Sequence, residues 1–416
     1  MKERLNTPDD SIKIRFATEE DLQTVYENQA RAYGISVAPG DVEGWKRKVE
    51  LEDILVAEDV SDPRRPFLVA TFLCYKLRLT VPGGTSLRAA WLAMVTVAAT
   101  HEGRGIWQQI SIQGFGILQD RGYPFICGVP TQPTVYDILG AGVASYHRTY
   151  NIDRRFAKLR GEPLRKRARE LNAAEARSEV PPIYERWCGI THGSLARDSA
   201  WWDDYLEDRV TQRDNGSELN FIIHPDGFLT YRVMGGKPHA FRPPFGTLVV
   251  QDFCAITDEA HTELLATLLS LESFNDIEIE LPVDDPLPLK LRDPRPAQTA
   301  GISDFLWLRI MNVPDVLGKR IYSADVEVVL EVTDPLVVAG GRYLLQTRDG
   351  IGTCTPHDGR PDIRIGLAEL GTVYMGAHSV SELHAADRIT ELRSGALVNL
   401  EAAFSTQRAP YSGTLF

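Results

Sequence analysis

Several features that define other protein classes are missing from this 416-residue chain. It contains no run of about 18 apolar residues, the minimum for a membrane-spanning helix, so we expect no membrane partner. Residues 1–6 are mostly charged or polar and lack the apolar core of a secretory signal peptide. These absences favour a soluble protein, and its length favours two or three domains over one core.

Cysteine is scarce and unpaired in the sequence. The five cysteines form no C-x-x-C motif and no even framework of the kind found in disulfide-rich secreted domains. Their scatter predicts a reducing cytoplasm as the location of the protein. They are Cys74, Cys127, Cys188, Cys254 and Cys354.

An excess of basic residues is also missing. The chain has 45 Lys and Arg against 57 Asp and Glu, a formal net charge of −12. Nucleic-acid binding needs a basic face, so we expect no nucleic-acid partner. The acidic excess is compatible with a cationic small-molecule substrate, although it could simply keep the protein in solution.

The common catalytic signatures are absent too. The sequence has no H-E-x-x-H, no G-x-S-x-G and no P-loop. Its nine histidines are dispersed, and His378 and His384 are six positions apart, a poor spacing for one metal ion. We therefore expect no metal site.

The most informative stretch that is present covers residues 94–107. An apolar strand pattern leads into Gly103-Arg104-Gly105, and an apolar helical spacing follows and ends at Gly122. A strand that turns through glycines into a helix N-terminus presents N–H groups and the positive end of a helix dipole. The segment is therefore either a phosphate or pyrophosphate site or a plain strand–helix connection.

Turns and proline-rich stretches divide the chain into three blocks, 1–155, 156–300 and 301–416. A run of arginines and lysines between residues 154 and 177, interspersed with glutamates, is expected to form a solvated helix. Strands are expected in the first block at 53–57, 66–79, 88–97 and 125–129, with a hairpin turn at Pro82-Gly83-Gly84.

The second and third blocks again mix strands and helices. In the second, Asp258-Glu259 opens a helix where the first block has its glycine turn, so no cofactor site is expected there. The second block should contain strands at 220–224, 227–233, 247–255 and 277–281 and a helix through 264–271. The third should contain strands at 326–332, 343–347 and 363–367 and helices at 370–375 and 379–392.

Residues 102–107, Glu-Gly-Arg-Gly-Ile-Trp, resemble the Arg/Gln-x-x-Gly-x-Gly/Ala turn that binds the pyrophosphate of acetyl-CoA in GNAT acyltransferases. Gly105 and the positive charge of Arg104 are kept. Glu102 and Trp107 replace the two ends of the pattern. A carboxylate near a pyrophosphate is unfavourable, and an indole fills space normally left for close approach of the backbone.

From end to end, the chain resembles the enhanced intracellular survival (Eis) family of aminoglycoside and polyamine N-acetyltransferases. The resemblance rests on residues 14–22, where Thr18 should cap the first helix, on 131–140, on 306–314 and on the aromatic last residue. It implies an α+β (mixed α/β) fold with three domains. These are a GNAT domain at 1–155, a second, degenerate GNAT domain at 156–300 and a sterol-carrier-protein-like domain at 301–416.

The resemblance also implies roles for single residues. Tyr136 matches the general acid that protonates the CoA thiolate, and the α-carboxylate of Phe416 matches the general base or amine anchor. From the residues alone, Tyr136 could equally pack on a helix start, and Phe416 could end a frayed tail. Tyr411, Leu415 and Phe416 give this tail apolar side chains with which to dock. Acetyl-CoA is expected to contact Val95, Thr96, Val97, Gly103, Arg104, Gly105, Ile106, Trp107, Gln108, Thr131 and Gln132.

The resulting prediction is a cytoplasmic enzyme that transfers an acetyl group from acetyl-CoA to an amine of a cationic small molecule of the aminoglycoside or polyamine type. One alternative is a repurposed scaffold that no longer uses acetyl-CoA and catalyses a different reaction, or binds a small molecule, in the same cleft. A second is a lipid-binding protein that uses the C-terminal domain. The resemblance further implies a homo-oligomer, a hexamer built through the two C-terminal blocks.

Overall fold

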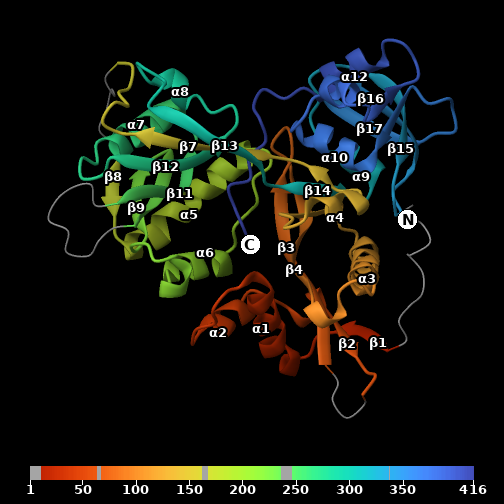
Figure 1. Ribbon diagram of the computed structural model, residues 1–416. Helices are drawn as coiled ribbons and strands as arrows, with labels where there is room; N and C mark the ends of the chain where they lie inside the picture. The colour runs from red at the N-terminus through yellow and green to blue at the C-terminus, as the bar shows by residue number, and fades with distance from the viewer. Residues whose placement is uncertain (1–10, 63–66, 162–166, 236–245, 337) are drawn as a thin grey trace. The chain divides into compact units, whose positions relative to one another are not determined.

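The computed structural model describes residues 11–416 except 63–66, 162–166, 236–245 and 337 (Figure 1). The chain forms two compact units, which are described separately below. The first comprises residues 1–77, 88–129 and 416, and the second comprises residues 78–87 and 130–415. Both contain helices and strands in alternation, so the predicted α+β class is confirmed.

The first unit is built on five strands in the order β1-β2-β3-β4-β5. β1 and β2 are antiparallel, as are β2 and β3, whereas β4 and β5 run parallel. Val25 of α1 and Trp45 of α2 are buried in one apolar cluster with Ile54 and Leu73. The elements are β1 (Ile12–Phe16), α1 (Leu22–Tyr33), α2 (Asp41–Lys46), β2 (Ile54–Asp59), β3 (Phe67–Thr80), β4 (Ser86–Val97), α3 (Ile106–Asp120) and β5 (Phe125–Gly128).

Two local predictions for the first block are confirmed. Thr18 occupies the N-cap position of the first helical turn, as predicted, and its backbone N–H and hydroxyl donate hydrogen bonds to the Asp21 carboxylate at 2.7 and 2.9 Å. The β3–β4 hairpin turns at Gly83 and Gly84, whose φ values are +100° and +83°. Only glycine adopts such angles without strain, and this explains the Pro-Gly-Gly turn.

The larger sheet of the second unit has the order β13-β7-β12-β11-β10-β9-β8. Ile222 packs in one apolar cluster with α7, whereas its neighbours Phe221 and Ile223 pack in another with α5 and α6. This alternation places helices on both faces of the sheet. The elements are β7 (Tyr146–Asp153), β8 (Arg169–Leu171), α5 (Ala173–Ile190), α6 (Ser199–Glu207), β9 (Asn220–His224), β10 (Gly227–Met234), β11 (Thr247–Ala255), α7 (Asp258–Leu269), β12 (Asp276–Pro282), α8 (Leu287–Lys290) and β13 (Ala297–Asp304).

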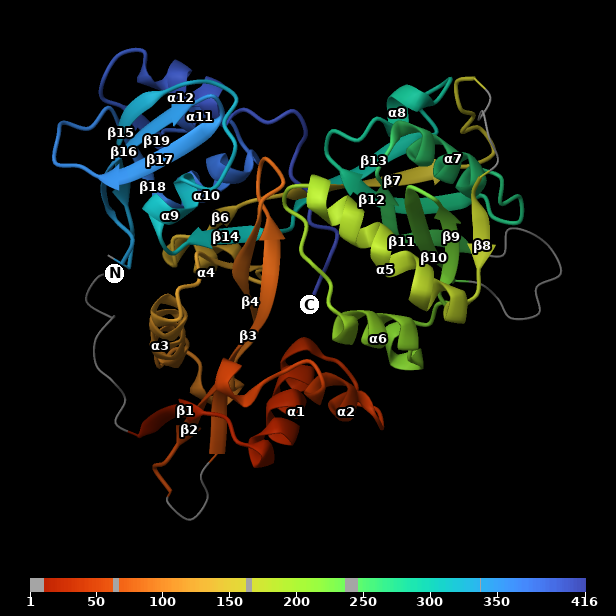
Figure 2. The same cartoon turned by 180° about the vertical axis from the view of Figure 1, so that it is seen from behind.

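A second sheet of this unit has the order β17-β16-β15-β18-β19, and β14 pairs separately with β6. Figure 2 shows α10 beside β14 and β6. The contact is close because a Cβ on Gly142 would lie 2.0 Å from the carbonyl oxygen of Ala368. The elements are α4 (Pro133–Ile138), β6 (Gly142–Val143), β14 (Trp307–Ile310), α9 (Val313–Leu317), β15 (Glu327–Thr333), β16 (Gly341–Arg348), β17 (Ile351–Pro356), β18 (Ile363–Gly366), α10 (Leu367–Met375), α11 (Val380–Ala385), β19 (Ile389–Glu391) and α12 (Ala396–Phe404).

A charged side chain occupies the interior of this C-terminal part. Arg320 is 1% exposed, and its guanidinium donates hydrogen bonds to the carbonyls of Tyr374 at 2.7 Å and Phe404 at 3.0 Å. Arg320 therefore ties α10 to the end of α12.

The predicted basic helix between residues 154 and 177 is wrong for residues 154–161 and 167–172. Residues 173–177 do begin a helix, and residues 162–166 lie outside the described part of the chain. The described residues there form turns at 154–156, then β8, and α5 begins only after Asn172. The Asn172 side chain accepts hydrogen bonds from the N–H groups of Ala174 and Glu175, both at 3.0 Å, and so fixes the helix start at this point. Arg154 instead binds the carbonyl oxygens of Phe274 and Leu269.

The predicted helix at 379–392 is only half correct. α11 ends at Ala385, and the chain then turns through Asp387, which has a φ of +57°, into β19. Ile389 is buried and pairs with Ile365 of β18. The pairing of this segment with the edge of the sheet outweighs its local preference for a helix. Such long-range pairing cannot be predicted from the local sequence pattern.

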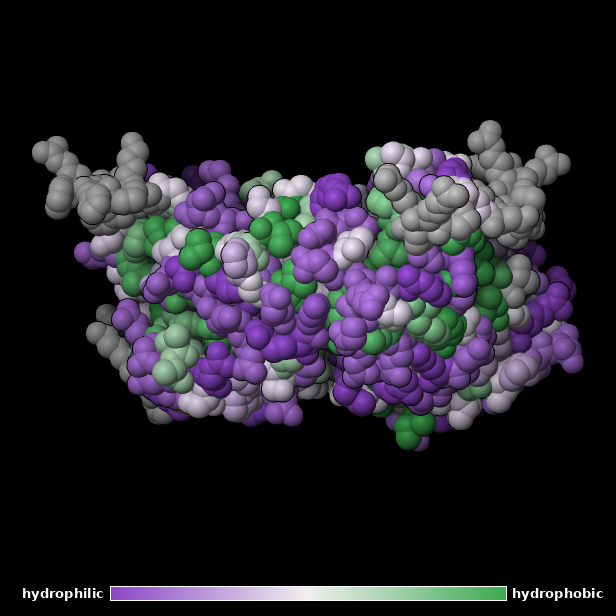
Figure 3. Space-filling model, turned by 90° about the horizontal axis from the view of Figure 1, so that it is seen from below, coloured by the Kyte–Doolittle hydropathy of each residue, from purple (hydrophilic) through white to green (hydrophobic). Residues whose placement is uncertain are grey.

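Among the described residues, no helix combines the length and apolar character needed to cross a bilayer. Hydrophilic residues cover most of the face in Figure 3, with apolar ones interspersed. This distribution fits a chain in which 25% of the residues are charged.

Candidate active site

The turn after β4 has the geometry expected of an anion site. Gly103 and Gly105 adopt φ values of +75° and +77°, and α3 begins at Ile106 directly after them. Trp107 and Gln108 complete the first turn of this helix, with Trp107 half-buried and Gln108 exposed. The first N–H groups of a helix have no acceptor within it, so they are available to a ligand at this turn.

The charged side chains of the turn differ in their surroundings. Arg104 donates a hydrogen bond to Ser11 at 3.0 Å, and its guanidinium lies 3.7 Å from the Asp59 carboxylate. Asp59 also pairs with His101 at 2.9 Å, and this hydrogen bond lowers the pKa of Asp59 below its ordinary value. Glu102 is exposed, so its charge is screened by water. The ion pair between Arg104 and Asp59 could not be predicted from the sequence, because the two residues lie far apart along the chain.

The pairing of β4 with its parallel neighbour β5 ends before β4 reaches the turn. β4 and β5 are paired from Ala89 to Trp91 of β4, yet β4 continues to Val97. Met94, just beyond the paired part, has a φ of +50°, which is unusual for a residue other than glycine. The half-buried residues Val95, Thr96 and Val97 therefore lie in a part of β4 that is not paired with β5 among the described residues. Their backbone groups could pair with an extended ligand.

Phe416 packs in the first unit. Its ring lies 5.7 Å from that of Trp91 on β4 and 6.3 Å from that of Tyr75 on β3, measured between centroids. The frayed-tail alternative is therefore wrong for this residue. Tyr411 is also buried, as expected, but the prediction for Leu415 is wrong because it is 61% exposed. The contacts with Tyr75 and Trp91 were not predictable from sequence spacing.

Tyr136 lies on α4 in the second unit. Thr131 and Gln132 precede this short helix and are exposed, and Gln132 occupies its N-cap position. Tyr136 is half-buried and meets the indole of Trp307 edge-on, with centroids 6.1 Å apart. The predicted site residues of this segment thus lie together on and just before α4.

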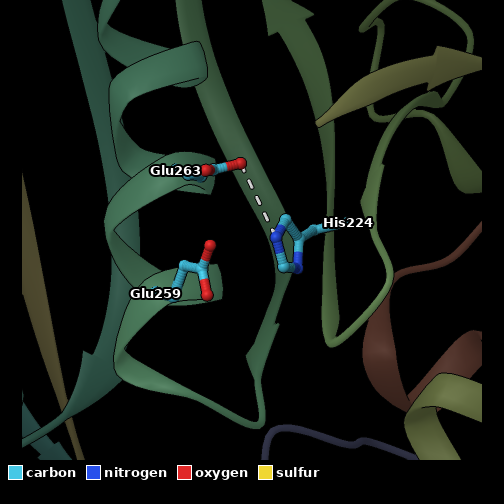
Figure 4. Close-up of side chains that lie close together, drawn as sticks. All are labelled: His224, Glu259 and Glu263. Carbon is cyan, nitrogen blue, oxygen red and sulfur yellow. Dashed lines mark ion pairs between the residues drawn. The ribbon is translucent and has the colours of Figure 1, made fainter. Parts of the chain in front are cut away.

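A second cluster of ionisable side chains belongs to the larger sheet of the second unit. His224 at the end of β9 faces Glu263 and Glu259, which are one helical turn apart on α7 (Figure 4). The His224 Nδ1 atom accepts a hydrogen bond from the Asp226 N–H at 3.1 Å. A neutral ring then carries its proton on Nε2, which lies 3.6 Å from Glu263. A metal at Nε2 would need the lone pair that this proton occupies, so the arrangement favours a buried histidine–glutamate pair.

Another acidic group, in the first unit, is held by a lysine. Lys76 Nζ lies 2.6, 2.8 and 3.0 Å from the carboxylates of Glu50, Glu52 and Asp53. Arg121 contacts Asp53 as well, at 2.8 Å. With a cation already at its centre, this group is a poor site for a metal ion.

Comparison with known proteins agrees with this geometry. An acetyltransferase (GNAT) domain model matches residues 13–144, a second matches residues 193–310, and a sterol carrier protein domain model matches residues 313–413. N-acetyltransferase Eis of Mycobacterium tuberculosis is 34% identical over 404 residues, which cover 95% of this chain and 97% of that protein. An uncharacterized N-acetyltransferase of Streptomyces griseus is 29% identical over 95% of this chain and 99% of that protein. Among solved structures, Eis1 of Mycobacterium abscessus superposes with a TM-score of 0.85 at 30% identity, covering 97% of this chain and 100% of the other. The chain therefore belongs to the Eis family of GNAT N-acetyltransferases.

Proposed function

We propose that this enzyme transfers the acetyl group of acetyl-CoA to an amine of a cationic small molecule of the aminoglycoside or polyamine type. The observation that carries the proposal is that the pairing of β4 with β5 ends at Trp91, in a strand that continues toward the glycine turn. Acetyl-CoA needs these two features, an unpaired strand edge for its amide-containing arm and N–H groups for its pyrophosphate. The net charge of −12 supports a cationic acceptor.

Each proposed contact follows from its backbone position. Val95, Thr96 and Val97 would bind the pantetheine arm as a short added strand. Gly103, Arg104, Gly105, Ile106, Trp107 and Gln108 would surround the pyrophosphate, and Thr131 and Gln132 would flank the bound acetyl-CoA.

Two residues would carry the proton transfers. The α-carboxylate of Phe416 would accept a proton from the attacking amine, and Tyr136 would donate one to the leaving thiolate. A chain-terminal carboxyl has an ordinary pKa of about 3.5, which makes it a weak base in water. Packing of the Phe416 ring on Tyr75 and Trp91 supports the role because it holds the end of the chain against β3 and β4.

Calorimetric titration with acetyl-CoA tests the proposal. We expect micromolar binding, and release of free CoA only when an amine such as spermine or kanamycin is also present. Gly105→Ala should weaken binding because Gly105 has a φ of +77°, whereas Gly116→Ala, in open space on α3, should not. Absence of binding at millimolar acetyl-CoA would overturn the proposal.

That negative result would favour the repurposed scaffold as the second candidate. The observations that favour this candidate are the carboxylate of Glu102 and the indole of Trp107 at the two ends of the turn, together with the contact of Arg104 with Asp59. A screen of small molecules by thermal shift would then identify the ligand that binds along the part of β4 not paired with β5.

We also propose that the protein is a homo-oligomer, specifically a hexamer, formed through the two C-terminal blocks. The exposed edge strand β13, with Ile302 54% exposed, is compatible with such contacts. Light scattering should give a mass of about 280 kDa, six times the chain mass of 46.4 kDa, and a monomer at micromolar concentration would contradict this. Five free cysteines support the cytoplasm as its location.

A further inference from the structure

The residues just before the C-terminus are held by polar contacts within the second unit. Arg197 donates from Nε to the Thr414 hydroxyl at 3.0 Å and from Nη2 to the Gly413 carbonyl at 3.1 Å. Trp201 Nε1 donates to the Leu415 carbonyl at 3.4 Å. Because the side chain of Leu415 is exposed, this segment is held mainly through its backbone and one hydroxyl.

Arg197 is itself fixed in place. Its guanidinium forms two hydrogen bonds with the Asp252 carboxylate, at 2.7 and 3.1 Å, and both side chains are at most 4% exposed. The guanidinium also lies 4.1 Å and 4.0 Å from the ring centroids of Tyr184 and Trp201. A planar guanidinium held by a carboxylate and two rings offers its remaining N–H groups in fixed directions.

The hydroxyl of Thr414 has a defined direction in this network. The Tyr184 O–H donates to the Leu195 carbonyl at 2.7 Å, so its oxygen can only accept from the Thr414 hydroxyl, 2.8 Å away. The same Thr414 oxygen accepts from Arg197. The Thr414 hydroxyl therefore acts both as a donor, to Tyr184, and as an acceptor, from Arg197. Its loss would remove both hydrogen bonds at once.

We propose that Arg197, Tyr184 and Thr414 are positioning residues that fix the path of residues 413–415 and thereby the place of the Phe416 α-carboxylate. None of the three needs to touch a substrate. The inference rests on the proposed role of Phe416 as the base, since a base misplaced by about 1 Å can cost up to two orders of magnitude in rate.

Thr414→Val tests the proposal, because it removes the hydroxyl while nearly keeping the side-chain shape and leaves the Arg197–Asp252 pair intact. With acetyl-CoA and spermine or kanamycin as probes, we expect kcat to fall about tenfold and the KM for acetyl-CoA to stay within about twofold. Thr414→Ser keeps the hydroxyl and should restore most of kcat. Arg197→Ala is unsuitable, since it would leave Asp252 buried and unpaired.

Ser412→Ala is the matched control. Ser412 is 0% exposed and lies in the same tail, and its hydroxyl has no hydrogen-bond partner among the described residues. Its removal should leave kcat and the melting temperature unchanged. Equal kcat in Thr414→Val and Ser412→Ala would overturn the positioning role, as would a fall in Thr414→Val that Thr414→Ser does not reverse.

Failure of the inference can be distinguished from failure of the proposed function. If two glycines added after Phe416 abolish turnover while Thr414→Val does not change it, the carboxylate acts without the Arg197 network. If the extended protein keeps full turnover, the proposed base is wrong and the positioning role falls with it. Both results come from the same assay of CoA release.

Discussion

At the residue scale, two side chains of the turn between β4 and α3 control how a pyrophosphate would be held. Arg104 is shared with Asp59 and Ser11, so only part of its charge is available to a ligand. Glu102 is exposed and opposes an anion at this place. The sequence identified both residues, but only the structure shows that Arg104 is already engaged.

Replacing Glu102 by arginine should tighten acetyl-CoA binding about fivefold. Reversing one charge a few ångströms from an anion at a protein surface changes the binding free energy by about 1 kcal/mol. Calorimetry at low salt measures the gain, which should shrink in high salt. Glu185→Arg, at an exposed position on α5, changes the net charge equally and is the control; an equal gain there would show that the effect is not local.

The half-buried His192 gives a pH dependence of stability. Burial, with the positive charge of Arg320 as a second cause, lowers the pKa of His192 from 6.5 to about 4. Its Nε2 atom is buried and has no hydrogen-bond partner in the part of the chain that the structure describes. Below pH 6.5 the unfolded chain binds a proton there that the folded chain does not, so stability should fall as the pH drops from 6.5 to 4.

Across that range the loss should be about 3 kcal/mol in the free energy of unfolding. Urea denaturation of the protein and of His192→Gln at pH 7.5 and pH 5 measures this contribution, and the variant should lose less stability at pH 5. His384→Gln, at an exposed position, is the control. The same pH dependence in the protein and in His192→Gln would rule out His192 as the source.

At the scale of the elements, alternating apolar patterns located the strands well. β9, β10, β11, β12 and β15 lie within one or two residues of their predicted positions. β12 buries alternate side chains, whereas β9 and β10 are buried almost throughout, and both patterns are typical of strands. The failures lie where long-range contacts decide the outcome. The local sequence of β19 predicts a helix. In the structure Ile389 is buried and pairs with Ile365 of β18.

The packing of β6 against α10 gives a test at this scale. Gly142→Ala would place a methyl group 2.0 Å from the carbonyl oxygen of Ala368, so backbone must move. We expect a loss of about 1 to 3 kcal/mol in the free energy of unfolding. Gly189→Ala is the control. A methyl group added there, on α5, would meet open space, so this variant should be neutral or slightly stabilising. Equal stability of the two variants would show that β6 and α10 are not in close contact.

At the scale of the whole molecule, the order of domains could be read from the sequence because motifs and resemblance extend over the full chain. The contacts of the tail could not. Arg197 and Thr414 are separated by 217 positions, and Phe416 meets rings on β3 and β4. Each of these contacts is a single long-range pair, so it leaves no repeating pattern in the sequence from which it could be predicted.

Tyr136 tests the proposed proton donor. Tyr136→Phe should lower kcat by roughly two orders of magnitude, the usual scale for loss of a general acid. Stability should change by only about 1 kcal/mol, since one hydroxyl is removed. Combined with an extension after Phe416, the loss should be less than multiplicative if the two groups act as a unit. A variant with unchanged kcat would contradict the assignment.

The most direct measurement compares turnover of the protein with that of the same protein carrying two glycines after Phe416. The extension moves the α-carboxylate away from the Phe416 ring, which packs on Tyr75 and Trp91. Acetyl-CoA binding by calorimetry should stay within about twofold, while kcat falls by roughly two orders of magnitude through loss of the general base. An extended protein with full turnover would contradict the account and leave Phe416 as a structural residue alone.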